Sequence, residues 1–298
     1  MSARDLTQGP VATSLFRLTA PMMLGVSSSI LVSMIEIGFI GQLGTEYVAA
    51  VTFTFPLIMI LNSIALGIGI GTSSVIARGV GSGNQEDVRR LGTHSLLMVS
   101  ASMAVLSFVG WATIDPVFRA LGAGPDILPL IRSYLNIYYP SVILFTTTMV
   151  ASSILRANGN ANFPGIIMTL GAVFNLILDP FLILGWWGFP RLELAGAASA
   201  MAISRLATAA VLLVYVSRGQ MILVRDVARG FIQSCRRILH VGLPAMATQL
   251  IGPVTAAIIT RLLADHGEIV VAGFGVATRI EAVAVMLLFA LSGLSLIH

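Results

Sequence analysis

The chain has 298 residues and a formal net charge of +4, yet only 10% of its residues are charged and 56% are hydrophobic. A soluble domain carries roughly 25% charged residues to cover its surface. This composition excludes an ordinary soluble enzyme, a disordered chain and a nucleic-acid-binding module, and it leaves a polytopic membrane protein in contact with the lipid bilayer.

Eight apolar stretches are long enough to cross a membrane, which takes about 20 residues. In chain order they cover roughly 15–43, 48–77, 92–112, 130–155, 163–186, 193–217, 238–262 and 269–296. We therefore expect an all-α polytopic membrane protein. Most arginines fall at the N-terminus and in the connections after even-numbered spans. The positive-inside rule then predicts a cytoplasmic N-terminus in a bacterial-type inner membrane.

The first span begins with a segment that is repeated later in the chain. When Pro21 is placed on Pro244, Gly44 aligns with Gly267, and each copy reads as a helix, a short Gly/acidic turn and a second helix. The repeat divides the chain into a six-helix N-terminal lobe (1–218), a cytoplasmic inter-lobe linker (219–237) and the first two helices of a second lobe (238–298). A complete second lobe needs four more helices, so we expect a truncated chain or an unusual short form.

Two carboxylates lie deep within the predicted spans, Glu36 in the first and Asp179 in the fifth. At 1.5 Å per residue from the cytoplasmic ends, the two lie at similar depth. Asn175 shares the helix face of Asp179, one turn earlier. Carboxylate and amide oxygens suit hard cations such as Na⁺, and a carboxyl at membrane depth can also carry a proton. We expect Glu36, Asn175 and Asp179 to bind Na⁺ or H⁺.

These carboxylates also have structural interpretations. Asp179 can lie at a helix end among the outer headgroups, and Glu36 can form an ion pair with Arg205. Arg279 is expected to cap or pair locally, because Glu281, two residues on, does not share its helix face.

Further candidates concern a substrate cavity and hinges. Tyr138 and Tyr139 can stack on a cationic drug, although an interfacial aromatic role is equally compatible with them. Asn158 and Gln249 are weaker candidates for the same cavity. Pro180 follows Asp179 and frees a backbone carbonyl, so it is a possible hinge.

Several chemistries are excluded. The chain has no lysine, so it cannot hold ATP in a Walker A loop, and Cys235 is its one cysteine, which excludes a cysteine-rich metal site. His-Glu-x-x-His and Gly-x-Ser-x-Gly motifs are absent. We expect a non-enzymatic protein without a cofactor and without a nucleic-acid partner.

The ordered motifs of this chain resemble the multidrug and toxic compound extrusion (MATE) family, and they run from the first span to the last. They are Pro21 fifteen residues before Glu36, Gly41-Gln42-Leu43-Gly44, Ala77-Arg78-Gly79-Val80-Gly81-Ser82-Gly83, Leu155-Arg156-Ala157-Asn158-Gly159, Asn175-Leu176-Ile177-Leu178-Asp179-Pro180, and Val271-Ala272-Gly273-Phe274-Gly275-Val276-Ala277-Thr278-Arg279-Ile280-Glu281.

The resemblance implies twelve helices in two six-helix lobes that export cationic or amphipathic drug-like molecules by alternating access, driven by Na⁺ or H⁺ entry. It also implies that Glu36, Asn175 and Asp179 form the cation site, and that the first helix bends near Pro21. Two positions depart from the family pattern: Glu36 stands where an Asp is usual, and Met201 where many members have Thr. A thioether is a poor ligand for a hard cation, so H⁺ is favoured over Na⁺.

Two alternatives to a multidrug antiporter remain. One is a lipid-linked oligosaccharide flippase of the same superfamily, which would need a strongly basic cavity, whereas only Arg205 and Arg279 lie within spans. The other is a transport-inactive fragment. The coupling ion, the substrate and the oligomeric state are left open by the sequence.

Overall fold

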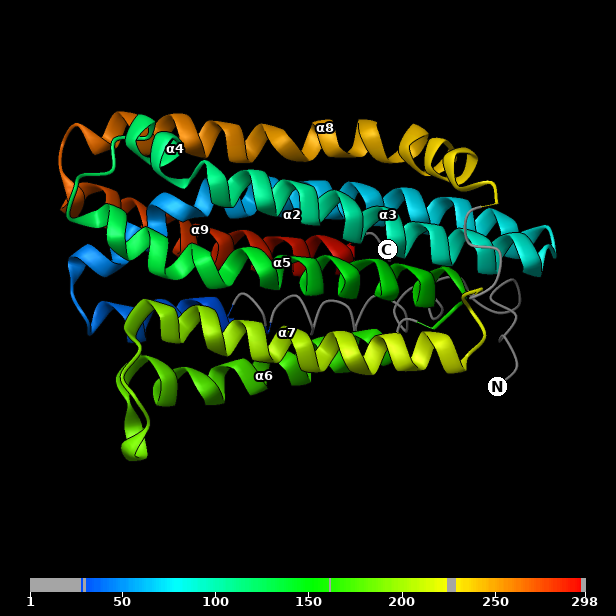
Figure 1. Ribbon diagram of the computed structural model, residues 1–298, viewed down its shortest axis with the longest axis horizontal. Helices are drawn as coiled ribbons and strands as arrows, with labels where there is room; N and C mark the ends of the chain where they lie inside the picture. Colours follow the sequence, from blue (N-terminus) through cyan, green and yellow to red (C-terminus); the bar gives the residue numbers. More distant parts are fainter. Residues whose placement is uncertain (1–27, 29–30, 161, 224–228, 296–298) are drawn as a thin grey trace.

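The computed structural model describes residues 28, 31–160, 162–223 and 229–295, with 282–295 as backbone only. Within these ranges it contains helices and no strand. The helices are Leu31–Gly41, α2 (Thr45–Gly81), α3 (Gln85–Ala112), α4 (Ile114–Ala120), α5 (Ile127–Ala157), α6 (Asn162–Leu184), the 3-10 turn η1 (Trp186–Gly188), α7 (Glu193–Arg218), α8 (Phe231–Ala264) and α9 (Glu268–Ser295). The long helices lie side by side in an elongated bundle (Figure 1).

The predicted membrane fold is confirmed. Six helices (α2, α3 and α5 to α8) are long and apolar enough to cross a membrane. Each coincides with one predicted span, Leu31–Gly41 lies within the first predicted span, and α9 matches the last one to within a residue at each end. Large apolar side chains also point outward, including Phe108 at 68% exposure and Ile251 at 68%, as expected for helices solvated by lipid.

Two short elements and one boundary differ from the sequence expectation. Helix α4 has seven residues and η1 has three, too few for a hydrophobic period to reveal them. Helix α8 begins at Phe231, earlier than the expected start at 238, so the predicted linker 219–237 overlaps its first turns. The arginine pair Arg236–Arg237 lowers local hydropathy but does not interrupt the helical backbone, because arginine is a good helix former.

The repeated segments share an unusual turn. Gly44 precedes α2 with φ of 145°, and Gly267 precedes α9 with φ of 99°. Both values lie in the region that favours glycine, because a Cβ there meets the backbone. The aligned glycines therefore occupy the turns of equivalent helix–turn–helix units, one in each predicted lobe.

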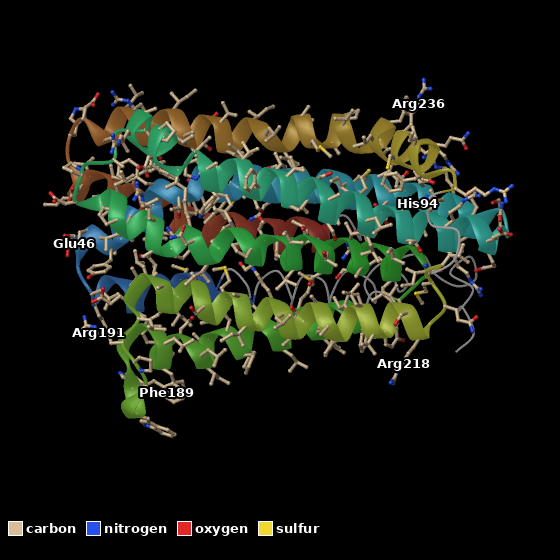
Figure 2. The ribbon with its side chains drawn as sticks, in the orientation of Figure 1. Glu46, His94, Phe189, Arg191, Arg218 and Arg236 are labelled. Carbon is tan, nitrogen blue, oxygen red and sulfur yellow. The ribbon has the colours of Figure 1, made fainter. Side chains whose placement is uncertain are left out.

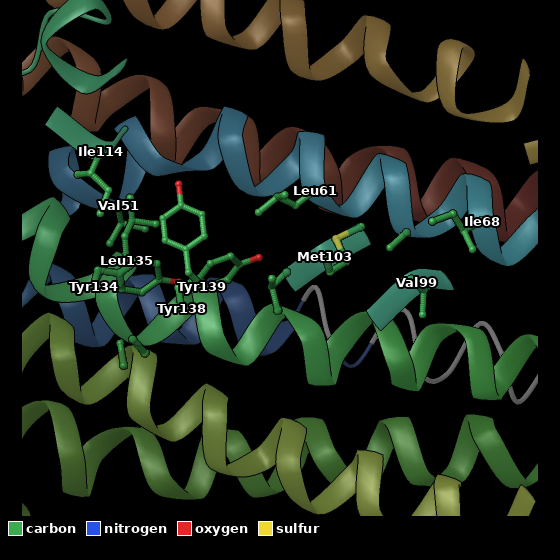
Figure 3. Close-up of a cluster of buried hydrophobic side chains, with 14 of the residues drawn as sticks. Val51, Leu61, Ile68, Val99, Met103, Ile114, Tyr134, Leu135, Tyr138 and Tyr139 are labelled. Carbon is green, nitrogen blue, oxygen red and sulfur yellow. The ribbon is translucent and has the colours of Figure 1, made fainter. Parts of the chain in front are cut away.

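Helices α2 and α5 contribute the largest shares of the buried core. In α5 the buried tyrosines stand out. Its Tyr134, Tyr138 and Tyr139 are 3%, 0% and 2% exposed. Figure 3 shows them beside Val51 and Leu61 of α2 and side chains from α3 and α4. Helix α5 also packs against α7, while α2 packs against α8 and α9. Thus α2 and α5 form the centre of the bundle, and the functional residues lie around them.

Candidate functional site

Asn175 and Asp179 form a buried pair on α6. The Asn175 amide Nδ2 donates to both carboxylate oxygens of Asp179, at 3.2 Å and 3.1 Å. Asp179 is fully buried and Asn175 is 7% exposed. The four-residue spacing places both side chains on one helix face, so the amide orients the carboxylate within the bundle. Asp179 therefore does not lie at an exposed helix end.

Glu36, on the helix Leu31–Gly41, lies next to this pair. It is 9% exposed and lines the same cavity as Asn175. Its charge and that of Asp179 are close enough to repel, whereas the guanidinium groups of Arg279 and Arg205 attract it. Two carboxylates from different helices therefore share one buried site, as their similar depth predicts.

The cavity beside this site has a volume of about 520 Å³. Its walls come from the first helix and from α2, α5, α6, α7 and α9, and most of the lining side chains are apolar. Such a cavity, with a few polar groups among apolar walls, is typical of a small-molecule site. Met201 of α7, which stands in place of the Thr of the family pattern, also lines the cavity.

Two arginines project into this cavity. Arg205 Nη1 donates to Ser141 Oγ at 2.9 Å, and its guanidinium lies 4.8 Å from the ring centre of Tyr138 and 4.9 Å from that of Phe145. Among the ion pairs of the described residues, none joins Arg205 to Glu36. The structural ion pair considered for Glu36 is therefore not formed, and Arg205 instead stacks on aromatic rings.

Arg279, on α9, reaches the cavity from the predicted second lobe. Its Nη1 donates to the Gly275 carbonyl at 2.9 Å, the local contact expected from the sequence. The same guanidinium lies 5.5 Å from the ring centre of Phe55 and lines the cavity wall. Arg279 therefore forms a local hydrogen bond and also lines the cavity.

Several buried polar atoms of the cavity lining have no hydrogen-bond partner among the described residues. They are Asn62 Oδ1, Tyr138 OH, Asn175 Oδ1 and Arg279 Nε. Leaving a buried polar group unpaired costs about 1–3 kcal/mol. Their gathering around one cavity indicates a place built to receive polar groups of a ligand.

The other residues singled out from the sequence lie elsewhere. Tyr138 lines the cavity, but Tyr139 packs against Gly110 of α3. Asn158 caps the end of α5, where its Nδ2 donates to the Ile154 carbonyl. Gln249 has an exposed side chain on α8, and its backbone carbonyl accepts from Ser63.

Of the two hinge candidates, Pro180 and Pro21, the structure describes only Pro180. Pro180 lies inside α6, which continues to Leu184. Pro21 lies outside the described residues. A bend at either position stays a prediction.

Sequence reasoning missed the aromatic rings of Phe55, Phe145 and Tyr134 that line the cavity. Nothing distinguishes them from other apolar residues in their helices. The one feature that could have pointed to these rings is an arginine inside an apolar span, such as Arg205. An arginine at membrane depth usually faces a cavity or a partner, so aromatic residues on neighbouring helices were candidates to line that cavity.

Comparison with known proteins places this geometry in a family. The model of the MatE family matches residues 21–181. A curated FAD transporter of Shewanella oneidensis is 37% identical over 290 residues, covering 96% of this chain and 64% of that protein. The multidrug export protein MepA of Staphylococcus aureus is 26% identical, covering 92% of this chain and 60% of that protein.

A solved structure gives the same result. The Vibrio cholerae MATE transporter VcmN in its bent form superposes with a TM-score of 0.80 at 32% identity, over 93% of this chain and 62% of that one. The chain thus spans about three fifths of the length of the relatives it matches. The family model covers more than half of this chain, and the fold and the motif order agree with it. This chain is therefore a member of the MatE family, whose members are transporters and not enzymes.

Proposed function

We propose that this chain forms the coupling site and substrate cavity of a cation-driven exporter. Glu36, Asn175 and Asp179 take up the coupling cation, and the adjoining cavity holds the exported molecule. The observation that carries the proposal is the buried Asn175–Asp179 pair beside Glu36. Carboxylates are seldom buried in apolar helices unless they serve a transport or relay function.

The positions of the charges support a coupling mechanism. Binding of a cation at Glu36 and Asp179 neutralises two carboxylates that repel each other. It also removes the attraction between Glu36 on the first helix and Arg279 on α9. Because these helices belong to different lobes, neutralisation weakens a contact between the lobes and favours their rearrangement in alternating access.

H⁺ is the favoured coupling ion, with Na⁺ at the same three residues as the alternative. Met201 lines the same cavity as Asn175, and its thioether is a poor ligand for Na⁺. The arginine-rich end of the bundle, which carries Arg218 and Arg236 in Figure 2, is proposed to face the cytoplasm of a bacterial inner membrane.

The test of the coupling site is the substitution Asp179→Asn. It keeps the size of the side chain and removes its ionisation, so we expect efflux driven by an imposed pH gradient to be abolished while expression is retained. Asp179→Glu keeps a carboxyl and should retain part of the transport. The measurement is efflux of FAD and of ethidium from vesicles, repeated without Na⁺ to distinguish the two ions.

A matched control is Asp265→Asn, because Asp265 is an exposed aspartate at one end of the bundle, paired with Arg261. Its efflux should equal that of the parent protein. Full efflux in Asp179→Asn would show that the assignment of the coupling site is wrong.

A second candidate concerns the substrate class. Among the residues that the structure describes, two arginines and the aromatic rings beside them line the cavity, against a single carboxylate, Glu36. Such a lining favours an aromatic molecule that carries a negative charge over the cationic drug implied by the family resemblance. A relative at 37% identity is named as an FAD transporter, and FAD has both properties. We therefore propose an anionic aromatic substrate such as a flavin nucleotide.

Equilibrium dialysis of the purified protein against FAD and against ethidium tests this substrate class. Arg205→Gln removes one cavity charge and should weaken FAD binding about tenfold, because a hydrogen bond to a charged group contributes about 1.5–3 kcal/mol. Ethidium binding should not fall. Arg119→Gln, at an exposed arginine of α4, is the control. Tighter binding of ethidium than of FAD in the parent protein would favour the cationic class instead.

A further inference from the structure

Within the part of the chain that the structure describes, the charge of Arg205, in the middle of α7, has no carboxylate partner in an ion pair. Its guanidinium carbon lies 4.8 Å from the ring centre of Tyr138 and 4.9 Å from that of Phe145. Both distances are within the roughly 6 Å at which a cation is attracted to the face of an aromatic ring. Tyr138 and Phe145 therefore form an aromatic cage around a charge that belongs to the protein.

The spacing of residues along α5 explains why this aromatic cage forms. Tyr138, Ser141 and Phe145 are three and four residues apart, so they follow one another on one face of the helix. Ser141 Oγ donates to the Tyr138 carbonyl at 2.8 Å. A serine hydroxyl has one hydrogen to donate and can also accept, so Ser141 Oγ meets the Arg205 guanidinium as an acceptor, at 2.9 Å. This hydrogen bond fixes the guanidinium beside both rings.

Helix α7 is anchored on α6 in a way that turns Arg205 towards α5. Ser204 Oγ donates to the Gly171 carbonyl of α6 at 2.6 Å. Thr208, one turn later, packs against the same glycine. Arg205 follows Ser204 directly, so its side chain points about 100° away around the helix, and α5 is the helix that it reaches. The packing of α7 against α6 and α5 therefore sets the position of the guanidinium.

The aromatic cage borders the cavity of about 520 Å³, because Tyr138, Phe145 and Arg205 all line that cavity. Tyr134, one turn before Tyr138 on α5, stacks against Tyr138 with ring centres 5.8 Å apart and lines the cavity as well (Figure 3). Removal of the Arg205 side chain would therefore leave aromatic faces in contact with the open volume. Aromatic cages of this kind bind quaternary ammonium ions.

We propose that Arg205 determines the charge specificity of this cavity by occupying the aromatic cage that a cationic molecule would otherwise enter. The inference rests on the proposed function, in which this cavity holds the exported molecule. The guanidinium excludes a cation in two ways, because it fills the space beside both rings and its positive charge repels a second one. An anionic molecule meets neither obstacle, and the guanidinium attracts it. One side chain thereby selects the charge of the molecule that the cavity accepts.

The test measures binding of tetramethylammonium, a small quaternary cation, to the purified full chain in a maltoside detergent, by saturation-transfer NMR of its methyl protons. Arg205→Ala should bind tetramethylammonium at least about tenfold more tightly than the parent protein, since desolvated cation–π contacts supply roughly that factor. Phe145→Leu in the Arg205→Ala background keeps an apolar side chain but removes one aromatic face, so most of the gain should disappear. Arg205→Gln, whose side chain ends one atom short of the guanidinium carbon, retains the stem and should show a gain in the same direction.

The matched control is Arg279→Ala, which removes the other arginine of the cavity lining and leaves the aromatic cage filled. Its affinity for tetramethylammonium should rise about threefold at most, because the cage rings remain occupied. Equal gains in Arg205→Ala and Arg279→Ala would overturn the proposal, because they would mean that the total charge of the cavity decides. A gain that survives Phe145→Leu undiminished would also overturn it, and so would the absence of any gain.

These outcomes are separable from those of the proposed function, because tetramethylammonium binding requires neither efflux nor FAD. Tighter tetramethylammonium binding by Arg205→Ala, lost again with Phe145→Leu, would support the role of the cage even if the parent protein failed to bind FAD. Weaker FAD binding by Arg205→Gln without any gain for tetramethylammonium would leave the anionic substrate class in place and overturn the role of the cage.

Discussion

At the scale of single residues, the site is decided by which polar atoms find partners inside the bundle. The Asn175 amide nitrogen donates to Asp179, and the Asn175 side-chain carbonyl oxygen has no protein partner among the described residues. Arg205 satisfies its guanidinium through Ser141 and the faces of aromatic rings. In the described ranges, the Asp179 carboxylate and the Arg205 guanidinium are therefore each held in place without an ion pair.

The ion pair between Asp115 and Arg132 illustrates a different use of charge, at the surface. Arg132 Nε donates to Asp115 Oδ1 at 2.7 Å, and this hydrogen bond holds the pKa of the Asp115 carboxyl below its usual range. A carboxyl whose pKa is lower in the folded protein stabilises the fold above its unfolded pKa, about 3.9. That stabilisation is lost as the pH falls through the lower, folded pKa.

We therefore predict that Arg132→Gln lowers the melting temperature slightly at pH 7 and that the difference disappears in acid. It should be constant from pH 7 to about 5 and shrink as the pH falls further, and it should vanish once the pH is below the lowered pKa of the folded state, where Asp115 is protonated in both states. Melting curves in detergent across this range provide the measurement. A difference that persists undiminished in acid would show that Arg132 acts through packing and not through Asp115.

At the scale of elements, the contact between α2 and α8 depends on small residues. Gly67 and Gly71 of α2 allow the backbone of α8 to approach within van der Waals contact. Helices in membranes associate through such close packing, because lipid offers no hydrophobic driving force between them. The first helix of the predicted second lobe thus lies in direct backbone contact with α2 of the predicted first lobe.

This contact makes Gly71→Ala a destabilising substitution. Its Cβ would lie 2.3 Å from a backbone oxygen that cannot rotate away, so α8 must shift at a cost of about 1–3 kcal/mol. The melting temperature should fall by several degrees. Gly252→Ala in α8 is the control, because its Cβ meets nothing within 4 Å, and alanine favours the helix. Equal stability of the two variants would contradict the assigned contact.

At the scale of the whole molecule, the two predicted lobes meet along α2, which packs against both α8 and α9. Glu36 and Arg279 lie on opposite sides of this boundary and line one cavity. The geometry therefore connects the charge of the proposed coupling site to the contact between the predicted lobes. If the predicted lobes move relative to each other during transport, as proposed, a covalent link between α2 and α8 should stop transport.

A disulfide across this boundary tests the movement. A Cβ on Gly67 would lie 3.1 Å from Met246 Cβ, slightly closer than the usual separation in a disulfide, about 3.8 Å. In a Cys235→Ser background, Gly67→Cys with Met246→Cys should lose efflux under oxidation and regain it with dithiothreitol. The variant with Gly67→Cys alone should not respond to the oxidant. Undiminished efflux in the cross-linked protein would show that α2 and α8 move together.

The sequence by itself determined the features that depend on local chain properties. Spans follow from runs of apolar residues, and the shared depth of Glu36 and Asp179 follows from a constant rise per residue along two helices running in the same direction. The pairing of Asn175 with Asp179 follows from a four-residue spacing on one helix. Each of these needs no knowledge of how distant helices pack.

Only the tertiary structure decided which side chains share the cavity. Tyr138 and Tyr139 are adjacent in sequence, but neighbours on a helix point about 100° apart, so one lines the cavity and the other packs against Gly110. The approach of Arg279 to Glu36 joins two residues that are distant in sequence, one on the first helix and one on α9. Helix rotation and packing between distant segments set these positions, and no local pattern in the chain encodes either one.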